Sequence, residues 1–140
     1  MILFSSVTEI NSKKSLKTAL IYLLITIFCA LFGAVYELYS HEVYSFFMIY
    51  AFAFPLVCGA LPFCILALIC TRKHPCSLAR NLLHSGIGTL TVGCIVRGVL
   101  EIYGTTNQLS EYYWPVGIVL YSLGIIVCIL QFVFGFGEKE

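Results

Sequence analysis

The sequence predicts an all-α protein, a four-helix transmembrane bundle with up-down-up-down topology. Four apolar stretches occupy nearly all of the 140-residue chain, at about 16–38, 44–70, 77–103 and 113–136. Each has at least the ~20 residues that a helix needs to cross a bilayer. Charged residues make up 11% of the chain, against about 25% in a typical soluble domain. The connections are too short to hold a soluble domain, so residues 1–140 are expected to form a single integral membrane domain.

The first apolar stretch is expected to stay in the mature protein as a helix. Lys13, Lys14 and Lys17 form a basic flank like that of a signal peptide, but the apolar run that follows is longer than a normal signal-peptide core. Residues 1–14 mix apolar and polar types. This leaves two alternatives open, a short amphipathic segment on the inner membrane surface or a disordered tail.

The second stretch contains two prolines and a glycine, Pro55, Gly59 and Pro62. Proline lacks a backbone donor and clashes with the preceding turn, so kinks are expected here. The carbonyls near residues 48–51 and at Cys58 would then lose their usual partners. Either neighbouring helices satisfy these carbonyls or they line a wet cavity.

The third and fourth stretches carry signals for where their helices begin and end. Ser77, just after Pro75, is the expected N-cap of the third helix. Gly104 is a natural stop at its other end. Pro115 falls in the first turn of the fourth helix, where its missing N–H costs little.

The basic residues predict that both termini are cytoplasmic. Lys and Arg near helix ends are retained on the cytoplasmic side, and seven of the eight lie at ends that share one side of the predicted bundle: Lys13, Lys14, Lys17, Arg72, Lys73, Arg80 and Lys139. Only Arg97 lies inside a helix. The expected location is therefore the cell membrane, in a multi-pass, N-in and C-in arrangement. The net charge of +1 gives no field that would recruit nucleic acid.

Aromatic residues gather around the two predicted outer connections. Tyrosine and tryptophan have an apolar ring with a polar tip and prefer the membrane interface. We interpret both groups as an anchoring belt: Tyr36, Tyr39, Tyr44, Phe46 and Phe47 around the first connection, and Tyr103, Tyr112, Tyr113 and Trp114 around the second.

Small and polar residues recur every three or four positions on three of the predicted helices. Residues at this spacing share one helix face, and small residues let helices approach closely in lipid. We therefore expect three stripes to face each other: Tyr22, Thr26, Ala30, Gly33 and Glu37 on the first helix; Gly86, Thr89, Gly93, Arg97 and Glu101 on the third; and Gly117, Tyr121, Gly124, Cys128 and Gln131 on the fourth. Bulky aliphatic residues then face lipid.

Charged residues at the outer ends of the first and third helices form the candidate site. An arginine inside a membrane helix is costly unless it is paired. We predict that Arg97 bridges Glu101, one turn along its own helix, and Glu37 on the first helix, and so locks the two helices together. The alternative is a polar site open to the outer face, formed with Tyr36 and Tyr103, that binds an ion, a proton or a small polar solute.

The sequence indicates no cofactor, no metal and no catalytic constellation. His84 and His41 are expected at opposite membrane faces, where they cannot jointly bind one haem, and we interpret both as interface residues. The run from Cys70 to Cys76 offers thiolate and imidazole groups, but its spacing is not that of a zinc site. We therefore predict a protein that is not an enzyme.

Two segments of the chain are similar to known sequences: Phe32-Gly-Ala-Val-Tyr-Glu-Leu-Tyr-Ser-His41, continuing to Tyr50, and Ser85-Gly-Ile-Gly-Thr-Leu-Thr-Val-Gly93, continuing to Thr105. They resemble uncharacterised small four-helix integral membrane proteins of Gram-positive bacteria. The resemblance covers the first three helices and implies class and location, a bacterial cell membrane, without a mechanism.

The chain also resembles the small multidrug resistance transporters in size and helix number. Those proteins carry a key carboxylate in the middle of the first helix, whereas here residues 23–32 contain no acid and Glu37 lies at the outer end. The predicted role is therefore that of a non-enzymatic interaction, assembly or accessory subunit in the lipid bilayer, with another membrane protein or a second copy as partner. The alternative is a small transporter or channel-like protein with an outward-facing site at Glu37, Arg97 and Glu101.

Overall fold

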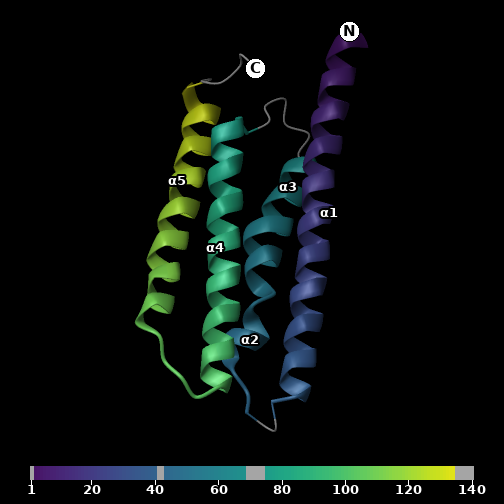
Figure 1. The fold of residues 1–140 in the computed structure, drawn as a ribbon. Helices are drawn as coiled ribbons and strands as arrows, with labels where there is room; N and C mark the ends of the chain where they lie inside the picture. The colour runs from purple at the N-terminus through teal and green to yellow at the C-terminus, as the bar shows by residue number, and fades with distance from the viewer. Residues whose placement is uncertain (1, 41–42, 69–74, 135–140) are drawn as a thin grey trace.

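The computed structural model describes residues 2–40, 43–68 and 75–134, with side chains from Ser12 onward. Within these residues the chain is all helical, and four segments are long and apolar enough to cross a membrane: Ser12–Leu38, Phe46–Leu68, Ser77–Ile102 and Gln108–Phe134. The prediction of four helices long and apolar enough to span a membrane is confirmed. The start of α1 and the end of α5 lie at the same end of the molecule (Figure 1). The predicted helix ends at 70 and 136 lie outside the described residues.

The first helix, α1 (Ile2–Leu38), is longer than its apolar stretch. Its 37 residues give a length of about 55 Å, and its first turns reach beyond the ends of the neighbouring helices (Figure 1). Residues 2–14 form neither a separate surface segment nor a disordered tail, because they belong to the same unbroken helix. No proline or glycine interrupts this part of the chain, so the helix that begins in the membrane can extend past it.

The second span is broken, as its prolines predict. It consists of α2 (Phe46–Tyr50), a turn, a π-helical segment η1 (Pro55–Ala60) and α3 (Leu61–Leu68). After α2 the Ala51 N–H bonds to the carbonyl of Met48, three residues back, at 3.4 Å. After η1 the Leu61 N–H bonds to the carbonyl of Leu56, five residues back. The regular four-residue pattern is therefore lost at both ends of the break.

The third span, α4 (Ser77–Ile102), begins one residue earlier than predicted. Cys76, not Ser77, is the N-cap, and its sulfur accepts the Ala79 N–H at 3.5 Å. The Cys76 N–H in turn donates to Oε1 of Gln131 at 2.6 Å. Ser77 is already helical, so its hydroxyl cannot cap the helix in the usual way.

The predicted stop of α4 at Gly104 is confirmed. Gly104 has a φ of 67°, a left-handed conformation that glycine adopts without a steric penalty. The Thr105 N–H bonds to the Leu100 carbonyl at 3.0 Å and the Gly104 N–H to the Glu101 carbonyl at 3.1 Å. These two bonds form a Schellman motif, which satisfies the carbonyls at the end of the helix.

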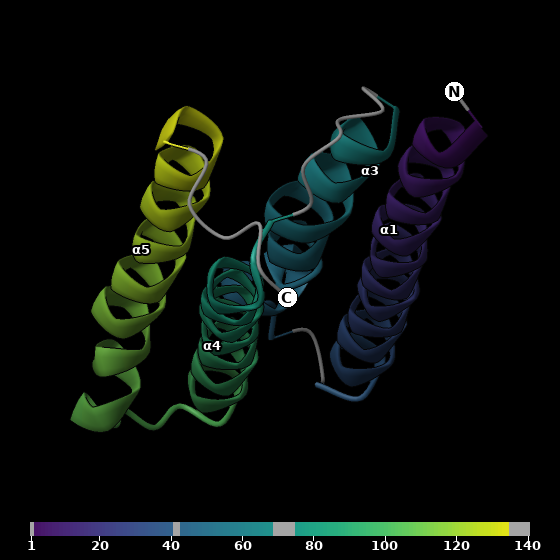
Figure 2. The ribbon, with the colours of Figure 1, turned by 90° about the horizontal axis from the view of Figure 1, so that it is seen from above.

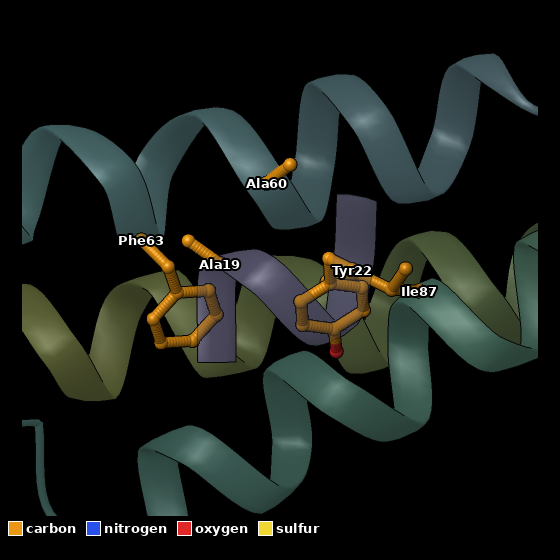
Figure 3. Close-up of a cluster of buried hydrophobic side chains, with 5 residues drawn as sticks. All are labelled: Ala19, Tyr22, Ala60, Phe63 and Ile87. Atoms are coloured by element: carbon orange, nitrogen blue, oxygen red, sulfur yellow. The ribbon is translucent and has the colours of Figure 1, made fainter. Parts of the chain in front are cut away.

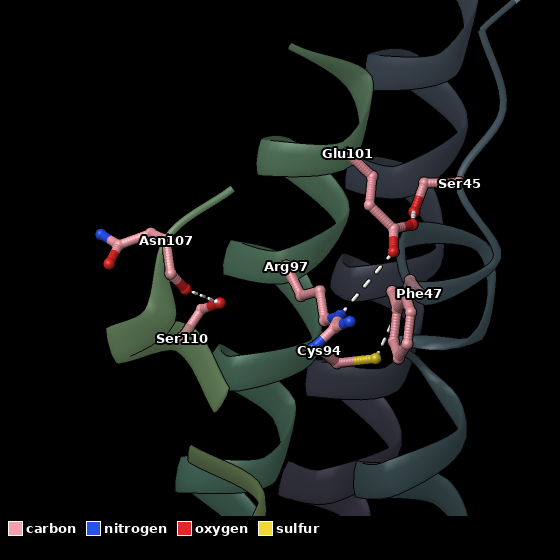
Figure 4. Close-up of polar contacts among 7 residues, drawn as sticks. All are labelled: Ser45, Phe47, Cys94, Arg97, Glu101, Asn107 and Ser110. Carbon is pink, nitrogen blue, oxygen red and sulfur yellow. Dashed lines mark hydrogen bonds and ion pairs between the residues drawn. The ribbon is translucent and has the colours of Figure 1, made fainter. Parts of the chain in front are cut away.

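The connection to the last helix contains a short 3-10 helix, η2 (Gln108–Tyr112), followed by α5 (Tyr113–Phe134). Asn107 begins η2 by accepting the Leu109 N–H at 3.0 Å. The Ser110 hydroxyl donates to the Asn107 carbonyl at 2.7 Å (Figure 4). Pro115 lies in the first turn of α5, as predicted.

The spans form two helix pairs joined through the first half of the second span. One pair is α1 with η1 and α3, and the other is α4 with α5, which share the most extensive contact in the molecule. The segments α2 and η1 join the pairs by packing against α4. Among the described residues, α1 makes no close backbone contact with α4 or α5, and from above α1 and α5 lie at opposite sides of the molecule with α3 and α4 between them (Figure 2).

The core lies where the two pairs meet (Figure 3). Its centre is a cluster of five buried residues from α1, η1, α3 and α4: Ala19, Tyr22, Ala60, Phe63 and Ile87. The ring of Tyr22 lies against Gly59, where an added Cβ would fall 2.5 Å from the ring. This glycine therefore provides the space for the tyrosine.

The predicted stripes pack only in part as expected. The small residues of α4 and α5 interdigitate: Gly86 and Gly93 lie against Tyr121 and Tyr113, while Gly117 and Gly124 lie against Leu90 and Leu83.

The stripe of α1 meets α4 at Tyr22, which contacts His84, but its part around Gly33 does not face α4, contrary to prediction. Gly33 lies against Met48 of α2, and Cys29 is buried in place of Ala30. Gly98 of α4 lies against the other side of Met48, which is 1% exposed. At this level the second span therefore separates α1 from α4.

We predict that Gly86→Ala lowers the free energy of unfolding by about 1–3 kcal/mol, the usual cost of overpacking. The added Cβ would lie 2.6 Å from the backbone nitrogen of Tyr121, so α4 and α5 must move apart. Thermal unfolding in detergent micelles measures the effect. Gly88→Ala is the matched control, because a Cβ there meets nothing within 4 Å. Equal melting temperatures for the two variants would contradict the packing described here.

Candidate functional site

A polar cluster around Arg97 and Glu101 connects the end of α4 to the start of α2 (Figure 4). Nε of Arg97 lies 3.7 Å from Oε1 of Glu101. The other carboxylate oxygen of Glu101 accepts a hydrogen bond from the Ser45 hydroxyl at 2.7 Å. Ser45 precedes α2 and is 1% exposed. The acid of the ion pair is therefore held by a buried hydroxyl of the second span.

Arg97 is also held by an aromatic group. Its guanidinium lies 5.0 Å from the centre of the Phe47 ring, a cation–π arrangement. The edge of Trp114 meets Phe47 at 6.0 Å and Phe54 at 5.6 Å between ring centres. Phe47 and Trp114 were interpreted as members of an anchoring belt, but they also pack α5 against the second span.

The predicted bridge from Arg97 to Glu37 is not formed. Within the described residues, the ion pair of Arg97 is with Glu101, and Oε1 of Glu37 is buried without a hydrogen-bond partner. The physical reason is that α2 lies between the two helices at this level, so Glu37 near the end of α1 does not reach Arg97. The ion pair therefore ties α4 to α2 through Ser45, and α1 is held by its packing on the second span.

Tyr36 and Tyr103 lie apart from the ion pair and from Glu37. They line a groove of about 400 Å³ between α1 and the end of α4, and they are close enough for their phenol groups to interact. Phe32, Val35 and Ile102 supply apolar walls. The five predicted site residues thus fall into an ion pair, a half-buried carboxylate and an aromatic groove, not into one pocket.

The sequence analysis did not predict a polar pair that lies between the middle of α1 and the first half of α4. The Tyr22 hydroxyl and Nδ1 of His84 are hydrogen-bonded between α1 and α4. The His84 ring also stacks on Phe63, with ring centres 5.6 Å apart. His84 is therefore part of the packing between helices and not the interface residue expected. The signal was its position one turn before Ile87, on the face of α4 that the core buries.

Two further bonds satisfy carbonyls at the break of the second span. Pro62 has no N–H to donate to Cys58, four residues earlier, and the Tyr121 hydroxyl donates to the Cys58 carbonyl at 3.3 Å. The Phe47 carbonyl accepts the thiol of Cys94 at 3.0 Å. Neighbouring helices thus satisfy these carbonyls, one of the two alternatives that the sequence left open.

The threonines in the middle of the spans bond to their own helices. Thr26 donates to the Tyr22 carbonyl, Thr89 to the Ser85 carbonyl and Thr91 to the Ile87 carbonyl, each at 2.8 Å. A hydroxyl bonded in this way needs no water or solute as a partner. In the described part of the chain, no group of three or more His, Cys, Asp or Glu residues is placed to hold a metal ion.

No protein-family model matches this chain, and no curated protein or solved structure matches it. The resemblance to small four-helix membrane proteins of Gram-positive bacteria stays a prediction.

We predict that Arg97→Leu lowers the free energy of unfolding by about 0.5–1 kcal/mol, the value of a partly exposed ion pair, because Glu101 loses its counter-charge. Adding Glu101→Gln should restore part of the loss, since glutamine still accepts the Ser45 hydroxyl. Melting in detergent micelles measures both variants.

The same Arg97→Leu change, measured in a Glu37→Gln background, tests whether Arg97 interacts with Glu37 as the sequence suggested or only with Glu101. The two changes should be additive, because Arg97 and Glu37 do not interact. Strong non-additivity would show that the two side chains are coupled after all.

We predict that Tyr121→Phe costs about 0.6–1.7 kcal/mol, the range for hydrogen bonds inside membrane proteins. In a Pro62→Ala background the cost should shrink, because the new Ala N–H can take over the Cys58 carbonyl. A double-mutant cycle of unfolding free energies measures this coupling. An equal cost in both backgrounds would mean that the hydroxyl does not compensate for the proline.

Proposed function

We propose that this chain is a small multi-pass protein of the cell membrane that acts as a non-enzymatic accessory or assembly subunit. The supporting observation is that polar groups in the middle of the membrane bond to the protein's own backbone. A transport pathway needs polar groups that can exchange these bonds for a solute or water. Here they stabilise a broken helix and two helix pairs instead.

Three positions are the most informative, because a transport pathway leading inward from the cluster around Arg97 and Glu101 would pass them. Thr26 bonds to the Tyr22 carbonyl, Thr89 to the Ser85 carbonyl, and Tyr121 to the Cys58 carbonyl. Each hydroxyl therefore has a partner within the protein, and that of Tyr121 reaches a carbonyl at the break of the second span. The geometry thus favours a dry interior along this line.

The small residues suggest where a partner would bind. Of the nine glycines in the described segments, seven lie against a neighbouring element, and a Cβ at Gly88 or Gly104 meets nothing within 4 Å. The glycine stripes therefore support the fold, and an assembly partner would meet the bulky apolar outer faces. A second membrane protein or a second copy of the chain fits such a surface.

An N-in, C-in orientation is part of the proposal. Lys13, Lys14, Lys17 and Arg80 lie at the end of the molecule where α1 begins and α4 starts. Positive residues at one end of a bundle favour the cytoplasmic side for that end. The connection between α4 and α5, with Asn107 at its centre, would then face outward.

One observation favours the alternative of a small transporter. Oε1 of Glu37 is buried without a hydrogen-bond partner, and ionisable groups inside membranes often serve transport. An outward-facing site at Glu37, Arg97 and Glu101 would need an aqueous path that continues past Arg97 toward Thr26 and Thr89.

We predict that Thr26→Cys, Thr89→Cys and Tyr121→Cys resist a membrane-impermeant thiol reagent added outside intact cells. The background lacks the native cysteines, with Cys94→Ser so that a donor to the Phe47 carbonyl is kept. Asn107→Cys is the control and should be labelled, since Asn107 is exposed in the outer connection. The labelled fraction is read from a mass-shift gel.

Labelling of the mid-membrane positions in folded protein would show an outward-open cavity and replace the accessory role with the transporter. If Asn107→Cys reacts only after the membrane is made permeable, the N-in, C-in orientation is wrong. Melting of each variant in micelles identifies any that have simply unfolded.

A further inference from the structure

A second groove lies between α1 and α4, nearer the start of both helices. It has a volume of about 420 Å³, within the range of about 300–1,000 Å³ in which proteins bind small molecules. Ile21 and Ile25 form part of one wall, Ile87 and Val92 part of the other, and Pro55 of η1 contributes to the floor. Because α1 and α4 make no close backbone contact, the groove opens sideways toward the lipid.

The interior of this groove suits a hydrocarbon chain. Its two threonine hydroxyls, those of Thr18 and Thr91, donate to carbonyls of their own helices at 3.1 and 2.8 Å. Tyr22 and His84 also line the groove, and they are hydrogen-bonded to each other. These polar groups therefore have partners within the protein. Gly88 keeps the groove open, because a side chain at this position would point into free space and meet no neighbour within 4 Å.

The inner end of the groove is basic. Lys14 and Lys17 lie one turn before the groove-lining residues Thr18 and Ile21, on the same face of α1, and both are exposed. Arg80 lies one turn before His84 on α4. Since α1 and α4 run in the same direction (Figure 1) and Tyr22 is bonded to His84, Arg80 lies near the depth of Thr18.

The dimensions match one leaflet of a bilayer. From Lys14 to Ile25 the helix rises by about 16 Å, and half of a hydrocarbon core is about 15 Å thick. The three basic residues thus lie at the headgroup level, while the apolar groove runs toward the bilayer midplane.

We propose that this groove is a binding site for one anionic glycerophospholipid of the inner leaflet. Lys14, Lys17 and Arg80 contact the phosphate-bearing headgroup, and one acyl chain lies along the groove beside Gly88. Basic pockets between transmembrane helices on the cytoplasmic side are suited to anionic headgroups. A zwitterionic lipid would fill the groove equally well but would gain less from the three positive charges.

The site is independent of the proposed accessory role, because it would exist whichever partner the chain binds. It rests on the N-in orientation only in assigning the lipid to the inner leaflet. Binding of the lipid itself can be measured with the purified protein.

The test is native mass spectrometry of the full chain, purified in detergent and mixed with equal amounts of phosphatidylglycerol and phosphatidylcholine. We expect one phosphatidylglycerol to be retained in preference. Gly88→Leu fills the groove and should abolish retention of that lipid. Ser122→Leu is the control, since it places a leucine on an exposed position of α5, away from the groove.

Removal of the positive charges should lower the preference for phosphatidylglycerol over phosphatidylcholine. Lys14→Gln, Lys17→Gln and Arg80→Gln should each weaken phosphatidylglycerol binding about fivefold, which corresponds to about 1 kcal/mol per charge near an anionic headgroup. Phosphatidylcholine retention should change little. Melting in micelles confirms that every variant is folded.

Equal retention of both lipids by the native chain, or unchanged retention by folded Gly88→Leu, would overturn the proposal. A change of oligomeric state in Gly88→Leu without loss of lipid would instead assign the groove to a second copy of the chain. Binding of free inorganic phosphate that competes fully with the lipid would show an anion site without a role for the acyl chain.

Discussion

The break in the second span constrains the rest of the structure, because lipid cannot bond to the backbone groups that the break frees. Each such group must find a donor inside the protein. The Cys58 carbonyl, left without its donor by Pro62, takes one from Tyr121 of α5, and the Phe47 carbonyl takes one from Cys94 of α4. The two helices that lie beyond the break are thereby fixed in position against it.

The same span also sets the spacing of its neighbours. Met48 lies between Gly33 of α1 and Gly98 of α4, and Gly59 makes room for the Tyr22 ring. Because these side chains fill the space between the helix pairs, the backbones of α1 and α4 stay apart, and the two helices meet only through side chains such as Tyr22 and His84. Both grooves between them follow from this separation, the aromatic one at the end of α4 and the aliphatic one nearer its start.

The sequence was sufficient where a local rule decides the structure. Lengths of apolar runs predicted the four spans, and proline and glycine chemistry predicted the break near Pro55 and Pro62 and the stop at Gly104. The interdigitating face of Gly117 and Gly124 followed from their spacing. Each of these features depends on one segment and its immediate surroundings.

The sequence was insufficient where the outcome depends on which helices are neighbours. Periodicity shows that Gly33 and Glu37 share a face of α1, but not that this face meets α2. The bridge from Arg97 to Glu37 failed for that reason, while the pair with Glu101, one turn away on the same helix, could be predicted. His84 was misassigned because its partner, Tyr22, is 62 residues away in the chain.

The arrangement of the helix pairs has a consequence for biogenesis. Backbone packing in the described residues joins each span only to the span before or after it. Each span after the first therefore finds a contacting neighbour already in the bilayer when it leaves the insertion machinery. Such a chain can assemble in the order of its synthesis, and the packing of α5 on α4 and its side-chain bonds to the broken span form at the end.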